Sequence, residues 1–185
     1  MRKAGYLTML LLSLAVTGSA LAKQEPYLIE HKVEQWGEQR ADKALVYIVR
    51  PATIGFAIKM WAFADREFLG VTKGKNYTYA HLAPGEHVFW SKAENVNAIR
   101  MYVDAGKTYY IQQHVRFGAW KASVELEILE EAEAKKLFEK CKYVTFTDRA
   151  TAKARKYIDK GYGEAQQAAS TFPASKFGET FAFDK

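Results

Sequence analysis

The sequence contains a single cysteine, Cys141, among its 185 residues. An internal disulfide is therefore excluded, and the folded core must be held together by packing alone. Cys141 is either buried and inert or available for pairing with another molecule. The neighbouring Lys140 and Lys142 would favour its thiolate, but a lone cysteine near the end of a predicted helix is more often structural.

The sequence also lacks an apolar run long enough to span a bilayer. The N-terminal run, residues 7–16, has about 10 residues, whereas a membrane helix needs about 20. Arg2 and Lys3 precede it and Ala20-Leu21-Ala22 follows it, which indicates a secretory signal peptide cleaved after Ala22. No cysteine follows these small residues, so we expect an unlipidated, periplasmic or secreted bacterial protein.

Motifs typical of hydrolases and nucleotide-binding proteins are missing as well. No serine stands in a G-x-S-x-G sequence, and the glycines of GVTKGK lack the phosphate-loop spacing. The histidines are scattered: His31, His81, His87 and His114. A two-histidine site across the Pro84-Gly85 turn, formed by His81 and His87, stays open, although a stable site needs three or four ligands. We predict no metal, no cofactor and no catalytic residue.

One pair of carboxylates is a candidate for catalysis. Glu125 and Glu127 lie two residues apart on one face of a predicted strand, about 7 Å from each other, which suits an inverting glycosidase. An alternating charged face of a strand is more often simply solvated, and the pattern implies no cleft. We therefore expect a protein that is not an enzyme.

The surplus of positive charge is confined to one segment. Loss of Arg2 and Lys3 with the signal peptide lowers the formal net charge from +6 to +4. Seven basic and two acidic residues lie between positions 140 and 160, so the rest of the mature chain is nearly neutral. This distribution argues against nucleic-acid binding by the core. The predicted basic helix at residues 149–160 is either solvated or makes a weak contact with an anionic membrane surface.

The remaining pattern is that of strands and turns. Between residues 82 and 115, Pro84-Gly85 and Ala105-Gly106 supply turns, and polar and apolar residues alternate between them. We predict a mainly β fold, an antiparallel β-sandwich of about seven to eight strands with a C-terminal helical extension. The predicted organisation is a signal peptide (1–22), a polar linker (23–42), a sandwich domain closing with a helix (43–142), and a basic helical segment with a phenylalanine-containing tail (143–185).

Tyrosines are the most prominent candidates for ligand contact. Several lie in neighbouring predicted strands, with basic residues close in the pattern, so that an aromatic and basic face could stack a sugar or grip a peptide. The candidate ligand-binding residues are Tyr77, Tyr79, Arg100 and Tyr102. The alternative is that these rings build the core and cover sheet edges, because strands are enriched in tyrosine in any case.

Five segments carry a family resemblance: ALVYIVRP, DREFLGV, LAPGEHVF, DAGKTYYIQQ and ELEILEEAEAKKLFEKCK. In this order, over residues 43–142, they resemble the Domain of Unknown Function 2846 family. The resemblance implies an exported bacterial β-sandwich module of the PEGA or transthyretin-like kind. Many members are lipoproteins, whereas this sequence lacks the cysteine that lipidation requires.

Together these features predict a non-enzymatic exported envelope protein that acts as a binding or assembly module. Its partner would be an envelope protein or a glycan. An envelope enzyme acting on cell-wall or lipid substrates, or an immunity or stress-response protein, are the alternatives.

Overall fold

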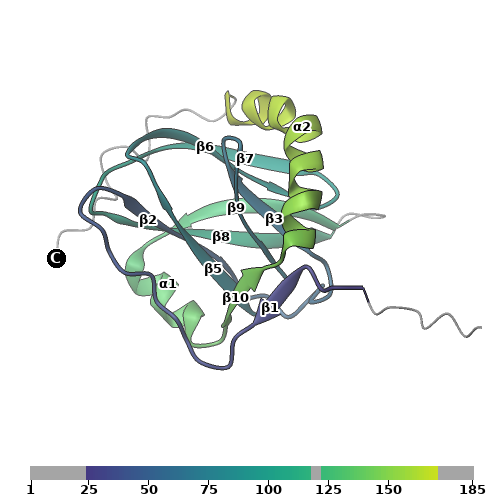
Figure 1. Cartoon of the computed structure of the whole chain (residues 1–185), viewed down its shortest axis with the longest axis horizontal. Helices are drawn as coiled ribbons and strands as arrows, with labels where there is room; N and C mark the ends of the chain where they lie inside the picture. The colour runs from purple at the N-terminus through teal and green to yellow at the C-terminus, as the bar shows by residue number, and fades with distance from the viewer. Residues whose placement is uncertain (1–23, 118–121, 171–185) are drawn as a thin grey trace, which may run out of the picture.

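The computed structural model of the chain describes residues 24–117 and 122–170 (Figure 1). The strands of this part are β1 (Leu28–Glu30), β2 (Ala44–Arg50), β3 (Met60–Ala64), β4 (Glu67–Thr72), β5 (Asn76–Leu82), β6 (Gly85–Lys92), β7 (Val96–Val103), β8 (Thr108–Phe117), β9 (Ala122–Leu129) and β10 (Lys142–Phe146). The helices are α1 (Glu131–Phe138) and α2 (Asp148–Ser170).

The strands form two sheets that pack face to face. The six-stranded sheet has the order β1-β10-β5-β2-β8-β9, and the four-stranded sheet has the order β4-β3-β6-β7. Strand β2 is buried along its whole length, as expected of a central strand covered on both faces. The core between the sheets is built mainly from aliphatic side chains, among them Val46, Ile48, Leu69, Leu82, Met101, Val103 and Ile111.

A helix covers the outer face of each sheet (Figure 1). Helix α2 crosses the four-stranded sheet, where Ala150, Ala154, Ala165 and Ala169 are fully buried. These small side chains let the helix approach Trp61 and Trp90 closely. Helix α1 places Phe138 on the outer face of the six-stranded sheet, within a cluster of tyrosines.

The structure confirms a mainly β fold with two sheets and a C-terminal helix. It corrects the expectation of a purely antiparallel arrangement. Strand β2 pairs in parallel with β8, and β5 pairs in parallel with β10. These pairs join strands that are far apart in sequence, so no turn motif in the sequence predicts them. With β1 and β10, the described residues form ten strands rather than seven to eight.

Residues 24–42, predicted to be part of a polar linker, pack on the six-stranded sheet. Strand β1 pairs with β10. The backbone N–H groups of Gln35 and Gly37 donate to the hydroxyls of Tyr77 and Tyr47, at 3.1 and 2.8 Å. Backbone hydrogen bonds, the buried Leu28 and the ring of Trp36 hold the segment, while most of its other side chains are exposed, which explains its linker-like composition.

Two other expectations concern residues outside the described ranges. They are the signal peptide at residues 1–22 and the tail phenylalanines Phe172, Phe177, Phe181 and Phe183. Among the helices of residues 24–117 and 122–170, none is long and apolar enough to cross a membrane.

Candidate functional site

The four predicted ligand-binding residues lie on opposite outer faces of the sandwich. Tyr77 and Tyr79 belong to β5 in the six-stranded sheet, where Tyr77 is fully buried and Trp36 stacks on it. Arg100 and Tyr102 belong to β7 in the four-stranded sheet. The structure therefore does not bring the four together, and the chain itself covers the Tyr77 side.

Arg100 and Tyr102 lie two residues apart on the same face of β7, and both remain accessible to solvent. Arg100 donates to Glu86 across the strand pair, with 2.7 Å between the atoms. Tyr102 keeps 55% of its surface exposed. This half of the predicted face is a solvent-facing strand surface.

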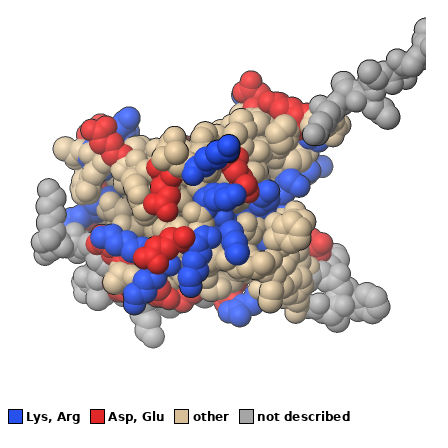
Figure 2. All heavy atoms as spheres, turned by 90° about the horizontal axis from the view of Figure 1, so that it is seen from below, with Lys and Arg blue, Asp and Glu red and all other residues tan. Residues whose placement is uncertain are grey.

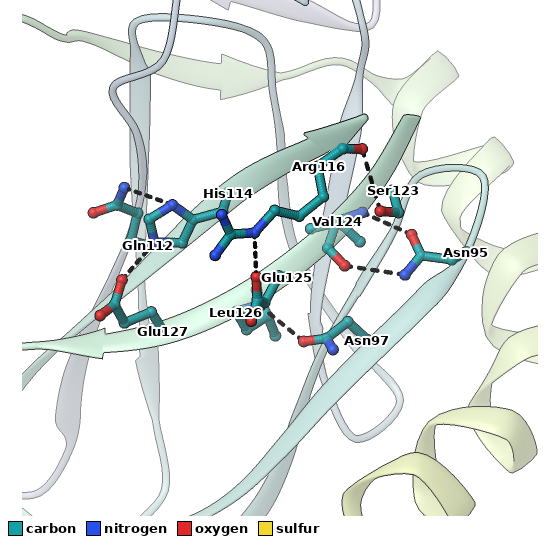
Figure 3. A network of polar contacts seen from close by, with 10 residues as sticks. All are labelled: Asn95, Asn97, Gln112, His114, Arg116, Ser123, Val124, Glu125, Leu126 and Glu127. Atoms are coloured by element: carbon teal, nitrogen blue, oxygen red, sulfur yellow. Dashed lines mark hydrogen bonds and ion pairs between the residues drawn. The ribbon is translucent and has the colours of Figure 1, made fainter. Parts of the chain in front are cut away.

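The carboxylates considered for catalysis are held by cross-strand partners (Figure 3). Glu125 accepts from Arg116 Nε, and Glu127 Oε2 lies 2.5 Å from His114 Nε2. Both glutamates are exposed on β9 and point away from the core. The arrangement is a solvent-exposed ladder of polar side-chain contacts on two neighbouring strands.

The two histidines at the Pro84-Gly85 turn have separate partners. His87 Nδ1 lies 2.7 Å from Asp65 Oδ2, and His81 Nε2 lies 2.6 Å from the carbonyl oxygen of Glu38. Within the residues that the structure describes, no group of three His, Cys, Asp or Glu side chains could hold a metal ion.

Cys141 is buried beneath α1 and the tyrosine cluster. Burial raises the pKa of its thiol to about 12, so the thiol stays protonated near neutral pH. Of the two alternatives that the sequence leaves open, the structure favours the inert one.

A groove opens where the first strand, the loop after β2 and the start of α2 meet. Its volume is about 510 Å³. We call it the cationic groove; it is lined by Pro26, Tyr27, Leu28, Phe56, Ala57, Lys59, Lys73 and Arg149. Three of these residues are cations, and none is a carboxylate. Figure 2, which views the molecule from the side of β1, β10 and α1, shows Lys and Arg side chains gathered around a few acidic ones.

The ring of Tyr27 is the centre of the positive charge. The Arg149 guanidinium lies 4.1 Å from the ring centroid, and the ammonium groups of Lys153 and Lys59 lie at 5.3 and 5.8 Å. Each is within range of a cation–π attraction. Burial alone would lower the pKa of Lys153, but hydrogen bonds and charges of Tyr157 and Tyr27 raise it above its ordinary value. Lys153 therefore stays charged at neutral pH.

A second hollow of about 260 Å³ adjoins the groove and shares Phe56 and Lys73 with it. It adds Lys75 and Lys142, and its one carboxylate is Glu30. Glu30 lies 3.1 Å from Lys73 Nζ and 3.6 Å from Lys142 Nζ. Burial alone would raise the pKa of Glu30, but hydrogen bonds from Lys73 and Asn76 and the charges of both lysines lower it.

Arg50 fixes the loop that carries Phe56. Its side chain is fully buried at the end of β2, and it donates to the carbonyl oxygens of Ile58 and Gly55, the latter at 2.7 Å. Within residues 24–117 and 122–170, its Nε has no hydrogen-bond partner. Burial lowers the pKa of Arg50 to about 10.

Gly74 holds the same loop from the other side. Its N–H donates to the carbonyl of Phe56, with 3.0 Å between the atoms. A Cβ at this glycine would lie 2.6 Å from the carbonyl oxygen of Ala52 and 2.9 Å from Phe56 Cα. Only glycine allows the two backbones to approach this closely.

The sequence profile of a family described as a protein of unknown function, DUF2846, matches residues 40–125. Residues 40–125 are therefore similar to the DUF2846 family. A protein of Haemophilus influenzae, itself described as uncharacterized, is 31% identical over 96 residues, which cover 51% of this chain and 57% of that protein. The chain thus matches little more than half of this relative's length. No solved structure matches this chain. The likeness to PEGA or transthyretin-like modules therefore stays a prediction.

The DUF2846 region supplies only part of the cationic groove. Phe56, Lys59 and Lys73 lie within residues 40–125, whereas Tyr27 and Arg149 come from the flanking segments. Sequence reasoning missed the groove because its residues come from distant parts of the chain. The one feature of the sequence that points to the groove is the cluster of basic residues after position 140, but the pattern alone indicates a basic helix there.

Proposed function

We propose that this protein is an exported, non-enzymatic binding module of the bacterial envelope, and that it holds an anionic group of its ligand in the cationic groove. The observation that carries the proposal is the arrangement of Lys59, Arg149 and Lys153 around Tyr27, with Lys73 in the same groove. Converging cations beside aromatic rings suit a ligand with a negative group and an apolar or planar part.

The balance of charge at the groove supports an anion. Lys73 and Lys142 share one carboxylate, Glu30, which leaves them incompletely neutralised. The amino end of α2 lies beside the groove at Arg149, and its dipole adds to the positive potential. A phosphate or carboxylate entering the groove would meet cations from three segments of the chain: Lys59, Lys73 and Arg149.

Two observations favour a binding module over an envelope enzyme. The carboxylates with suitable spacing, Glu125 and Glu127, are exposed on β9 and paired with Arg116 and His114. The thiol of Cys141 is buried, with its pKa raised by that burial. Export is proposed from the signal peptide features of the sequence.

Isothermal calorimetry with inorganic phosphate at low salt tests the proposal. We expect saturable binding that Lys73→Ala and Arg149→Ala each weaken by about fivefold, the loss of one charge contact of roughly 1 kcal/mol in water. The matched control is Lys156→Ala, which removes an exposed cation of α2 outside the groove. Absence of saturable binding, or an equal effect of all three variants, would refute the proposal.

A further inference from the structure

Large apolar side chains project into solvent beside the cationic groove. Ile54 is 70% exposed, Phe56 64% and Phe117 57%. We call these three residues the apolar tip. Ile54 and Phe56 belong to the loop after β2, and Phe117 ends β8. A Cβ placed on Gly55 would lie 3.1 Å from the Phe117 ring, so the loop and the end of β8 are in contact.

The backbone of this tip is held firmly although its side chains are exposed. Arg50 donates to Gly55 and Ile58, and Gly74 donates to Phe56. The Ile58 N–H also donates to the Gly55 carbonyl at 2.9 Å. The buried guanidinium of Arg50 thus positions a loop whose exposed side chains contribute little to the core.

Cations lie beside Phe56 of the apolar tip. Phe56 lines both the cationic groove and the adjoining hollow, which together contain Lys59, Lys73, Lys75 and Lys142. Apolar side chains flanked by lysines match the two layers of a membrane surface, since rings enter the boundary of headgroups and acyl chains while ammonium groups bind lipid phosphates. A soluble anion would use the lysines but would leave the exposed rings without a partner.

We propose that the apolar tip and the lysines around it dock this protein on an anionic lipid bilayer. This inference rests on the proposed function, because the cations of the groove would take the lipid phosphate. It places the apolar part of the membrane contact on the tip rather than on the predicted helix at residues 149–160, of which Arg149 lines the groove. Ala150, Ala154, Tyr157 and Ile158 of α2 pack against the four-stranded sheet, so the apolar side of that helix is already covered.

Sedimentation with vesicles of equal parts phosphatidylglycerol and phosphatidylcholine tests the inference, with pure phosphatidylcholine vesicles as the reference. We expect binding to the anionic vesicles only. Phe56→Ser should weaken it about tenfold, because the variant lacks the aromatic ring that the bilayer would bury. Lys59→Ala and Lys75→Ala should each weaken it about fivefold.

Two variants serve as matched controls. Tyr102→Ser removes a similarly exposed aromatic ring on β7, and Lys156→Ala removes an exposed cation of α2. Both should bind the anionic vesicles like the unchanged protein. Phe56 is exposed, so Phe56→Ser should unfold at the same urea concentration as the unchanged protein.

The inference is overturned if the protein does not bind anionic vesicles, or if Phe56→Ser binds them as tightly as Tyr102→Ser does. Phosphate calorimetry separates this outcome from a failure of the proposed function. Loss of vesicle binding with phosphate binding intact refutes membrane docking alone. Vesicle binding without phosphate binding in solution refutes the groove as an independent anion site and leaves the docking surface in place.

Discussion

Asn95 and Val124 exchange two hydrogen bonds across the edge where the two sheets meet (Figure 3). The Val124 N–H donates to Asn95 Oδ1 at 2.7 Å, and Asn95 Nδ2 donates to the Val124 carbonyl at 3.0 Å. Two residues further on, the Leu126 N–H donates to Asn97 Oδ1 at 2.8 Å. Strand β9 is an edge strand, and these asparagine side chains satisfy backbone groups that a neighbouring strand would otherwise pair.

The asparagine contacts predict a loss of stability on truncation. Asn97→Ala leaves the Leu126 N–H without this acceptor, so the free energy of unfolding should fall by about 1–3 kcal/mol. Urea unfolding followed by tryptophan fluorescence measures the change. Glu94→Ala, in the exposed turn before Asn95, is the control and should leave the midpoint unchanged. Equal midpoints for both variants would show that the edge contact contributes nothing.

Removal of Glu30 should strengthen anion binding. This carboxylate is the internal partner of Lys73 and Lys142, so Glu30→Gln releases both lysines for an external anion. We expect phosphate affinity to rise by about fivefold, from one repulsive contact of roughly 1 kcal/mol in water. Calorimetry on Glu30→Gln and on Glu133→Gln, a first-turn change in α1, provides the comparison. Unchanged or weaker binding in Glu30→Gln would contradict the assignment of the groove.

Alkaline pH should unfold the protein through the buried tyrosine cluster. Burial raises the pKa of Tyr47 and Tyr143 to about 12 from 10.0, and that of Cys141 to about 12 from 9.0. The folded state holds these protons more tightly, so its stability is complete below pH 9 and falls as the pH rises towards 12. The lowered pKa of Arg50 acts in the opposite direction, but it is one group against several.

The urea midpoint measured between pH 8 and pH 12 checks this expectation. Tyr143→Phe removes one ionisable hydroxyl from the cluster, so its midpoint should decline less steeply with pH than that of the unchanged protein. Tyr102→Phe, which changes an exposed tyrosine, should follow the unchanged protein. A flat midpoint over this range would show that the cluster does not control stability.

Arg50→Met tests whether the buried guanidinium holds the loop that carries Phe56. Methionine fills similar space but cannot donate to the carbonyls of Gly55 and Ile58. The amide of Ile58 should therefore exchange with deuterium faster, while the amide of Ile48 in β2 should keep its protection. Because the substitution also relieves the burial of a charge, global stability should change by less than about 2 kcal/mol. Equal exchange at Ile58 would remove Arg50 from its positioning role.

The sequence was informative wherever neighbouring residues determine the structure. The alternation of polar and apolar residues between positions 82 and 115 predicts strands such as β7, and the predicted C-terminal helical extension contains α2. Local patterns carry no information about pairing between distant segments. The parallel pairing of β2 with β8, and the contact of Trp36 with Tyr77, depend on the whole fold.

The candidate site was hidden for the same reason. Tyr27 and Arg149 are more than a hundred positions apart, yet the guanidinium lies over the ring. The tyrosines proposed as a ligand face pointed to a real aromatic cluster, but residues 34–37 of the chain cover it. Arg50 ends the segment ALVYIVR, and no local pattern indicates that its buried side chain donates to the loop carbonyls of Gly55 and Ile58.

Backbone amide chemical shifts recorded during a phosphate titration test the central claim most directly. They show where on the molecule an anion binds, without a variant. We expect saturable shifts confined to the residues of the cationic groove and its adjoining hollow, around Tyr27, Lys59, Lys73 and Arg149. Shifts spread evenly over exposed lysines elsewhere, such as Lys136 and Lys156, would contradict the claim that this groove is the binding site.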